Sequence, residues 1–180
     1  MDVVPLNDGC PVLMEMLMEQ AVELAGFFAA HAVWSVSGGE ILVPMLAQVD
    51  QSGARSMSRL VADHIEDGVE DGKRGLAVNS DGSVCAVLVY DGYITLPSGK
   101  TDALFLDIRA YRDPVEALTM ALPYRNQQSP QGFAVHRPKF LQYQGGGSPD
   151  YAQWGDAFFR GVDAHQQGAT IWNKASDPSI

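Results

Sequence analysis

Apolar and polar residues alternate along the middle of the chain, and this pattern predicts a long β-hairpin over residues 84–111. Even-numbered positions are apolar on both sides of a polar turn at 97–101, namely Val84, Ala86, Leu88, Tyr90, Ile94, Leu96, Leu104, Leu106, Ile108 and Ala110. A period of two is typical of strands that bury one face. The phase continues through Asp91-Gly92, which favours one continuous strand over a tight turn there. Folding about Gly99 pairs residues whose numbers add up to about 198, so even positions face even positions.

Helical periodicity predicts three helices around these strands. Apolar residues recur at spacings of three and four over residues 11–32, about 56–76 and about 150–166, and acidic residues follow the opposite side of the second segment. The glycine-rich stretch 145–149 predicts a flexible joint before the last helix. Residues after that helix are expected to be loose, with Ile171 and Trp172 as docking side chains.

Shorter strands complete the predicted sheet. A hairpin around Gly38-Gly39 would join residues 33–36 to 41–46, with a polar loop at 50–58 after it. Two more strands are expected at the positions 116–124 and 133–143. The whole pattern predicts an α+β fold, in which helices from the N-terminal half and a C-terminal helix cover an antiparallel β-meander sheet with the long hairpin at its centre. A length of 180 residues suits a single α+β domain spanning residues 1–180.

Charge narrows the range of partners. The chain carries 12 Lys and Arg against 22 Asp and Glu, for a formal net charge of −10. Nucleic-acid binding proteins usually present a basic face, so we expect no nucleic-acid partner. An acidic surface is typical of a soluble protein and also suits a basic partner protein.

No membrane segment or export signal is predicted. The most apolar run, residues 21–37, is interrupted by Glu23 and His31, which favours a buried helix over a membrane span. The first residues carry two acids and lack the basic region of a signal peptide. We therefore expect a cytoplasmic protein.

Metal and cofactor motifs are not predicted. Cys10 and Cys85 form no ligand cluster with each other or with the four scattered histidines, so we expect neither a zinc site nor a cofactor. A disulfide between the two cysteines stays open as an alternative. Cys85 lies within an apolar strand segment, where a thiol usually behaves as a small buried hydrophobe.

One short segment resembles a nucleotide-binding motif without meeting its requirements. The sequence Ser98-Gly99-Lys100-Thr101 matches the end of a phosphate-binding P-loop, but the position of the motif's first glycine is occupied by Ile94. A P-loop also opens a helix, whereas this segment joins two predicted strands. A hairpin turn explains all of these residues.

A carboxylate pair is the sharpest chemical candidate. In the register about Gly99, Asp91 lies opposite Asp107 on the more polar face, and Arg109 follows two residues along. Two like charges in this position require a shared proton, a metal ion or a neighbouring cation. Asp91, Asp107 and Arg109 are therefore candidate catalytic or ligand-binding residues. A surface ion pair with Arg109 is the structural alternative.

The sequence lacks a convergent catalytic set, such as a nucleophile elbow or an activated cysteine. The leading hypothesis is therefore a non-catalytic cytoplasmic protein that binds another protein, as an inhibitor, an immunity-type protein or an adaptor. The alternative is an enzyme or small-ligand-binding protein that uses the carboxylate pair. A third hypothesis is a homo-oligomer that buries the methionine-rich first helix or the last helix.

Overall fold

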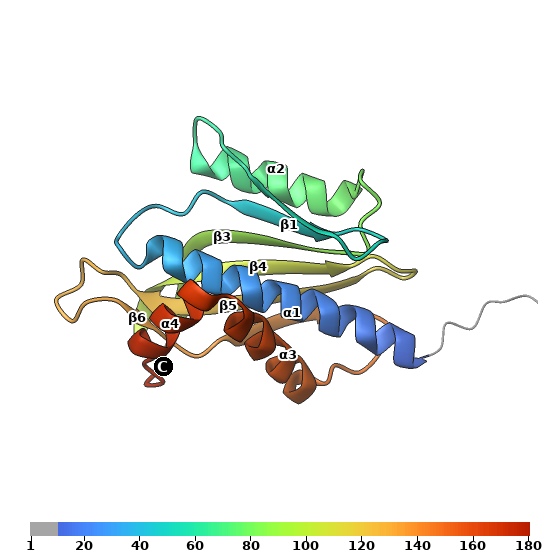
Figure 1. The fold of residues 1–180 in the computed structure, drawn as a ribbon. Coiled ribbons are helices and arrows are strands. Elements are labelled where there is room, and N and C mark those ends of the chain that lie inside the picture. Colours follow the sequence, from blue (N-terminus) through green and yellow to red (C-terminus); the bar gives the residue numbers. More distant parts are fainter. Residues whose placement is uncertain (1–10) are drawn as a thin grey trace, which may run out of the picture.

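Four helices and a seven-stranded antiparallel sheet make up the described chain in the computed structural model, which covers the backbone of residues 11–180 and the side chains of residues 16–180 (Figure 1). The elements are α1 (Pro11–Val36), β1 (Met45–Val49), β2 (Arg55–Arg59), α2 (Ile65–Val78), β3 (Cys85–Leu96), β4 (Gly99–Ala110), β5 (Glu116–Arg125), β6 (Ala134–Val135), β7 (Lys139–Gln144), α3 (Tyr151–Ala164) and α4 (Gln166–Ala175). The sheet order is β2-β1-β3-β4-β5-β6, and β7 also pairs with β5. The predicted α+β class, antiparallel meander and central hairpin are confirmed.

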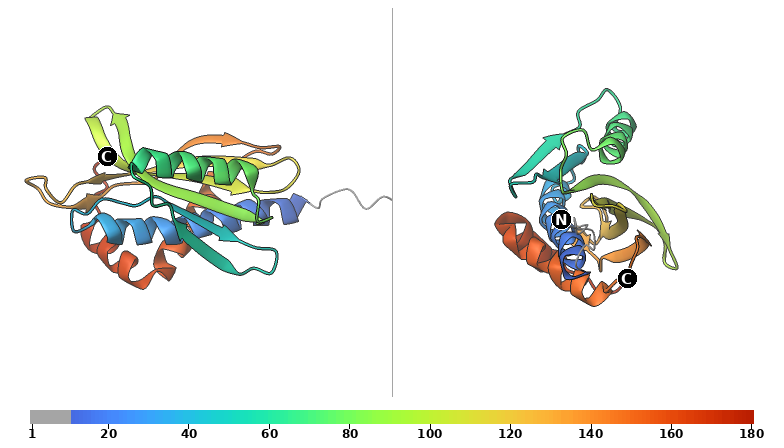
Figure 2. Two further views of the ribbon diagram at one scale, coloured as in Figure 1. Left: turned by 90° about the horizontal axis from the view of Figure 1, so that it is seen from above. Right: turned by 90° about the vertical axis from the view of Figure 1, so that its right-hand side faces the viewer.

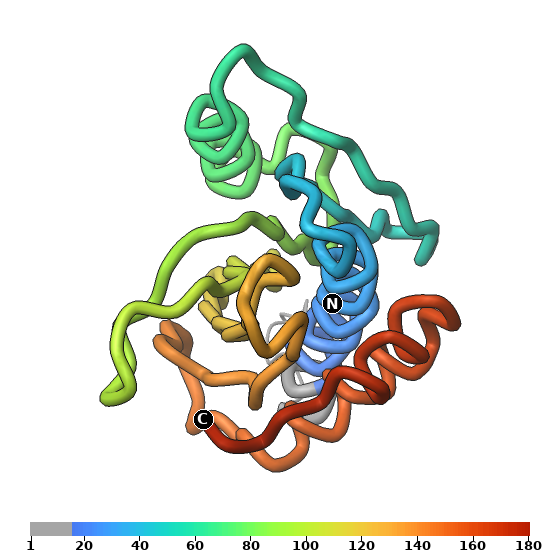
Figure 3. The backbone as a smooth tube through the Cα atoms, turned by 90° about the vertical axis from the view of Figure 1, so that its left-hand side faces the viewer, coloured from blue at the N-terminus to red at the C-terminus, as the bar shows by residue number. Residues whose placement is uncertain are grey.

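The helices cover both faces of the sheet unequally. The sheet curls around the side on which α1 lies, and α3 and α4 cover α1 from its other side (Figures 2 and 3). The smaller helix α2 lies alone on the opposite face, over β1 and β3 (Figure 1). Each face of β3 is consequently covered by a helix.

Burial on two sides explains the composition of α1. Fully buried apolar residues cover well over half of its circumference, and the stripe through Met16, Gln20, Glu23, Phe27 and Trp34 is partly or fully exposed; the buried ones include Ala21, Val22, Leu24, Ala25, Ala29, Ala30, Ala32 and Val33. A helix whose apolar face is this wide has to be covered from more than one direction. Here the sheet covers one side of α1, and α3 and α4 cover the other.

Three predictions of secondary structure are wrong near the ends of elements. Residues 33–36 form the last turn of α1 rather than a strand, and Gly39 then adopts a left-handed φ of 89° that ends the helical segment. The short hairpin instead pairs β1 with β2, so part of the expected loop 50–58 is a strand. Helix α2 begins only at Ile65, later than expected.

The C-terminal segment is more ordered than expected. Residues 166–175 form α4, and its Trp172 is buried against the core. His165 separates the two last helices and caps the second one, because its Nδ1 atom accepts a hydrogen bond of 3.0 Å from the backbone N–H of Gly168. A side-chain cap of this kind stabilises a new helix start directly after the preceding helix has ended.

Glycines allow α3 and α4 to pack against α1 with their backbones nearly in contact. A Cβ atom at Gly26 of α1 would lie 1.9 Å from the carbonyl oxygen of Phe158, and one at Gly161 of α3 would lie 1.9 Å from that of Glu23. At Gly168 of α4, a Cβ atom would lie 2.3 Å from a carbonyl oxygen of α1. Any larger residue would push the helices apart.

We therefore expect Gly161→Ala to lower the free energy of unfolding by about 2 kcal/mol or more, the range for overpacking of a tight interior. Gly155→Ala in the same helix is the matched control, because no atom lies within 4 Å of the added Cβ. Alanine is the better helix former, so the control should gain up to about 1 kcal/mol. Urea denaturation of both variants measures the difference, and equal stability would contradict the close packing.

Candidate functional site

The predicted opposition of Asp91 and Asp107 is wrong. The strands β3 and β4 pair with residue numbers that add up to 195, because Leu96 pairs with Gly99 across a two-residue turn. Asp91 therefore faces Leu104, and Asp107 faces Leu88. An odd sum places even positions of one strand beside odd positions of the other, which puts the two aspartates on opposite faces of the sheet.

Asp91 lies on the face that packs against α1. Its two carboxylate oxygens accept hydrogen bonds of 3.1 and 3.0 Å from the hydroxyl of the buried Tyr124, and Oδ1 also accepts from the backbone N–H of Gly92. Burial raises the pKa of Asp91. The hydrogen bonds from Tyr124 and Gly92 oppose this rise, and the nearby negative charge of Asp102 adds to it. On this face the neighbouring carboxylate is thus that of Asp102, which lies diagonal to Asp91 in the hairpin register.

Asp107 and Arg109 lie on the other face, beside α2. The carboxylate of Asp107 is buried and accepts hydrogen bonds from Tyr90 and Thr119, at 3.3 and 3.0 Å. Burial, followed by the proximity of Asp107, raises the pKa of Tyr90. Arg109 donates to the carbonyl oxygen of Ile108, and the described residues give it no ion pair. The structure therefore keeps Asp107 and Arg109 on one face without joining them to Asp91.

Lys100 lies in the hairpin and not in a phosphate-binding loop. It is the second residue of β4, and its Nζ atom sits 3.9 Å from the ring centroid of Tyr93. A cation over an aromatic face stabilises the exposed tip of the hairpin. The rejection of a P-loop on sequence grounds agrees with this strand–turn–strand geometry.

Removing the Tyr124 hydroxyl tests whether its hydrogen bonds to Asp91 stabilise this carboxylate in the core. Tyr124→Phe leaves a half-buried carboxylate with one backbone donor, and we expect it to lower the free energy of unfolding by about 1–3 kcal/mol near neutral pH. The loss should shrink as the pH falls, because burial raises the pKa of Asp91 and a protonated carboxyl is easier to bury.

The exposed Tyr93, two residues along the same face, provides the control: Tyr93→Phe should change stability by only a few tenths of a kcal/mol, as is usual at exposed positions. Urea denaturation at several pH values measures both variants. A pH-independent loss for Tyr124→Phe would show that the hydroxyl does not act through Asp91.

The edge strand β2 combines an exposed backbone edge with two exposed arginines. Among the described strands it pairs with β1 alone, and all five of its residues are exposed. The backbone N–H of Leu60 donates to Pro44 and that of Asp50 donates to Ala54, so the even-numbered residues of β2 form the bonds to β1. By alternation, Arg55, Met57 and Arg59 direct their backbone N–H and C=O groups to the free edge.

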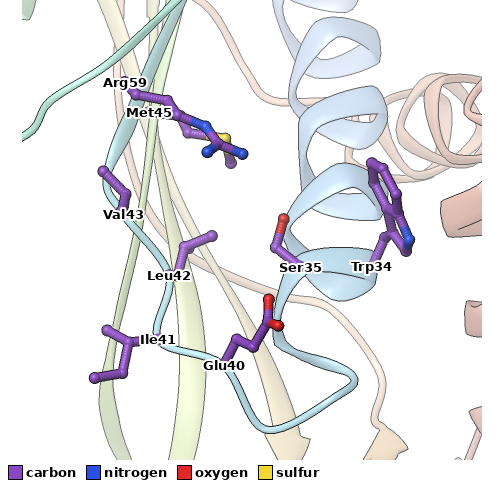
Figure 4. A pocket seen from close by; sticks show the side chains of 8 residues that line it. All are labelled: Trp34, Ser35, Glu40, Ile41, Leu42, Val43, Met45 and Arg59. Carbon is purple, nitrogen blue, oxygen red and sulfur yellow. The ribbon is translucent and has the colours of Figure 1, made fainter.

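A cleft of about 270 Å³ lies at the end of this edge, between β2 and the last turns of α1. Figure 4 shows the side chain of Arg59 reaching from the strand side toward α1, with Trp34 and Ser35 on the helix. The extended segment after α1 forms the remaining wall, with Glu40 at one end, and it contributes Ile41, Leu42 and Val43. Trp34 is 45% exposed and Ile41 is 78% exposed, so large apolar side chains surround a single arginine.

The edge is basic although the protein is acidic. Arg55 makes only a long ion pair of 3.9 Å with Glu23 of α1, and Arg59 has no carboxylate within 4.0 Å among the described residues. A chain with net charge −10 has acids available for most of its cations. Two arginines with little or no compensation, on one face of an edge strand, form a local site for anionic groups.

A histidine pair lies beneath this surface and joins α1 to α4. The Nδ1 atom of His31 lies 3.0 Å from Nε2 of His165, and Trp34 packs on both rings. Because Nδ1 of His165 accepts from Gly168, the proton of this neutral ring is on Nε2 and is donated to His31. A further proton on either ring would place two N–H groups face to face, so this geometry holds only while both rings are neutral.

The histidine pair makes stability depend on pH. Burial, then His165 and then Arg59, lower the pKa of His31 below its ordinary 6.5. A folded pKa below the unfolded value means that the stabilisation is complete above the unfolded pKa of about 6.5 and is lost as the pH falls from there through the lower folded pKa. We expect wild type to lose about 1 kcal/mol between about pH 7.5 and 5.5, the magnitude of one hydrogen bond.

His31→Gln should flatten this pH dependence, whereas His64→Gln, at an exposed position before α2, should keep it. Chemical denaturation at a series of pH values provides the measurement. If wild type and His31→Gln have the same slope, the histidine pair does not control stability.

Sequence reasoning missed β2 and the histidine pair for different reasons. The signal for β2 was present, because Arg, Ser, Met, Ser and Arg alternate with a period of two at 55–59, but small polar residues favoured a loop. His31 and His165 are 134 positions apart and no local pattern connects them. Cys85 is a free, buried thiol whose pKa burial raises to about 11, and Cys10 lies outside the described residues.

Comparison with protein-family models, curated proteins and solved structures finds no significant match. Of the helices that are described, none combines the length and hydropathy needed to cross a membrane. Within the same part of the chain, His, Cys, Asp and Glu side chains do not gather into a group of three or more that could hold a metal ion. Geometry and charge are therefore the basis for assigning a function.

Proposed function

We propose that the protein is a non-catalytic binding protein that receives an extended, acidic segment of a partner protein along β2. The observation that carries the proposal is the free edge of β2, whose outward backbone groups lie between Arg55 and Arg59 and beside the apolar cleft. An extended peptide can add a strand to such an edge, and side-chain pockets then supply specificity.

Charge and shape support a particular kind of segment. Carboxylates at alternate positions would meet Arg55 and Arg59, since these side chains share one face of β2. An apolar side chain next to them would enter the cleft against Trp34. An inhibitor, an immunity-type protein or an adaptor would each be able to act through this mode of binding. We place the interaction in the cytoplasm, where the free thiol of Cys85 is in keeping with a reducing environment.

The enzyme hypothesis based on the carboxylate pair loses its main support. It requires Asp91, Asp107 and Arg109 to converge, and the register places Asp91 on the other face of the sheet. Charged residues on an edge strand also have a protective role, because they discourage pairing between copies of a protein. The two roles predict different results when the charge and the backbone of β2 are changed separately.

A photo-crosslinking residue at position 57 in the native host identifies the protein segment in contact with β2. That segment, synthesised as a peptide, is then titrated calorimetrically against the purified protein and its variants. We expect Arg55→Glu combined with Arg59→Glu to weaken binding at least tenfold, because two attractive contacts become repulsive. Arg137→Glu, an exposed position between β6 and β7 at the other edge, should bind like wild type.

A backbone variant separates strand addition from simple charge attraction. Met57→Pro removes one outward N–H without touching the bonds to β1, and proline is tolerated at such edge positions. Against Met57→Ala, which loses only the side chain, it should weaken binding about tenfold, or about 1.4 kcal/mol. Equal binding by these two variants would exclude strand addition. A crosslink only to a second copy, with dimers in light scattering, would instead support a homo-oligomer.

A further inference from the structure

A second cavity lies at the opposite end of α1 from the β2 cleft, and a buried ion pair forms part of its wall. The guanidinium of Arg112 pairs through Nη2 with Oε2 of Glu116, and the hydroxyl of Tyr143 donates to the other oxygen of Glu116 at 2.6 Å. Only 17% and 4% of the two charged side chains are exposed. Burial and the hydrogen bond to Glu116 raise the pKa of Tyr143 to about 12, so this donor stays protonated.

The buried arginine has hydrogen-bond donors to spare. Within the described part of the chain, Nε and Nη1 of Arg112 have no hydrogen-bond partner although both atoms are shielded from solvent. Buried charged donors without an acceptor are unfavourable and are rare in native proteins. An acceptor that is not part of the described chain would satisfy them, and carboxylate oxygens fit a guanidinium best.

The space beside these atoms is small and mixed in character. The cavity measures about 250 Å³ and lies between the ion pair, the start of α3 and the glycines before it, which carry no side chains to fill it. Met18 and Trp154 provide apolar surface, and Asp150 and Gln153 provide polar groups. Pockets for drug-sized ligands measure about 300–1,000 Å³, so this one suits a small metabolite.

Charge balance decides which small molecule fits. Glu116 already neutralises Arg112, and Asp150 adds a second negative charge to the wall, so a simple anion would enter a site that is negative overall. A ligand that carries both a carboxylate and an ammonium group adds no net charge to the site, and it gives Arg112 and Asp150 each a partner of opposite sign. One oxygen of Asp150 caps α3 by accepting from Gln153, while the other accepts no hydrogen bond from the described residues and is available to an ammonium group.

We propose that this cavity binds a free α-amino acid, with its carboxylate at Arg112, its ammonium group toward Asp150 and its side chain against Met18 and Trp154. The site is separate from β2 and does not depend on the proposed partner. Its occupation would link the hairpin end of β4 and β5 to the start of α3, because residues from both regions line the cavity.

Calorimetric titration of the full chain with each standard amino acid, one at a time and up to millimolar concentration, tests the proposal. At least one amino acid with an apolar side chain should bind saturably. Its two matched analogues, one without the ammonium group and one without the carboxylate, should each bind at least tenfold more weakly; for leucine these are isocaproate and isoamylamine. Failure of every amino acid to bind, or equal binding of either analogue, would overturn the proposal.

Two conservative variants connect binding to the cavity. Arg112→Lys keeps a cation beside Glu116 but removes the Nε and Nη1 donors, and Asp150→Asn keeps a good helix cap while removing the charge. Each should weaken the best amino acid at least tenfold. If Arg112→Lys does not fold, Asp150→Asn decides the question, since asparagine caps a helix as well as aspartate. Unchanged affinity in a folded variant would exclude this cavity as the site.

Discussion

The burial of α1 on two sides is the constraint on which the rest of the structure depends. Its buried apolar surface covers well over half of the helix, so the sheet alone cannot cover it, and α3 and α4 must supply the second layer. Glycines bring the backbones together where these helices cross, so no side chain separates them at those points. The same layer places His165 beside His31 and positions Asp150 and Trp154 at the second cavity. Both candidate sites therefore lie at the ends of one buried helix.

The long hairpin shows how a small change in turn length alters chemistry. With a two-residue turn, Asp91 joins the face of Tyr124 and Asp102, while Asp107 joins the face of Tyr90 and α2. Each carboxylate is satisfied by hydroxyl donors of its own face, and no joint site is formed. Positive groups with unused hydrogen-bonding capacity occur instead at two other places. Arginines are exposed on β2, and Arg112 is buried near the second cavity with donors unused.

Local patterns were sufficient for much of the fold but for little of the candidate sites. The hairpin over 84–111, the strand near 116–124 and the helix near 150–166 follow from periodicity within each segment, and the structure confirms them. The strand β2 and the helix α4 were missed because both elements are short and their sequences are polar or only weakly periodic. Their conformation is decided by tertiary contacts, namely the pairing of β2 with β1 and the docking of Trp172 on the core. The sites were missed because they join residues far apart in the chain.

The sequence by itself determined which segments alternate, which helix is the most apolar and which sign of charge prevails. A period of two fixes the relation between residues within a strand, but the relation between strands depends on turn length and on what covers each face. In β3 both faces are apolar near Cys85 and Leu88, so alternation there could not tell which face meets α1. The register was decided only in the tertiary structure, where the two-residue turn places Leu104, Leu106 and Ile108 on the face that packs against α1.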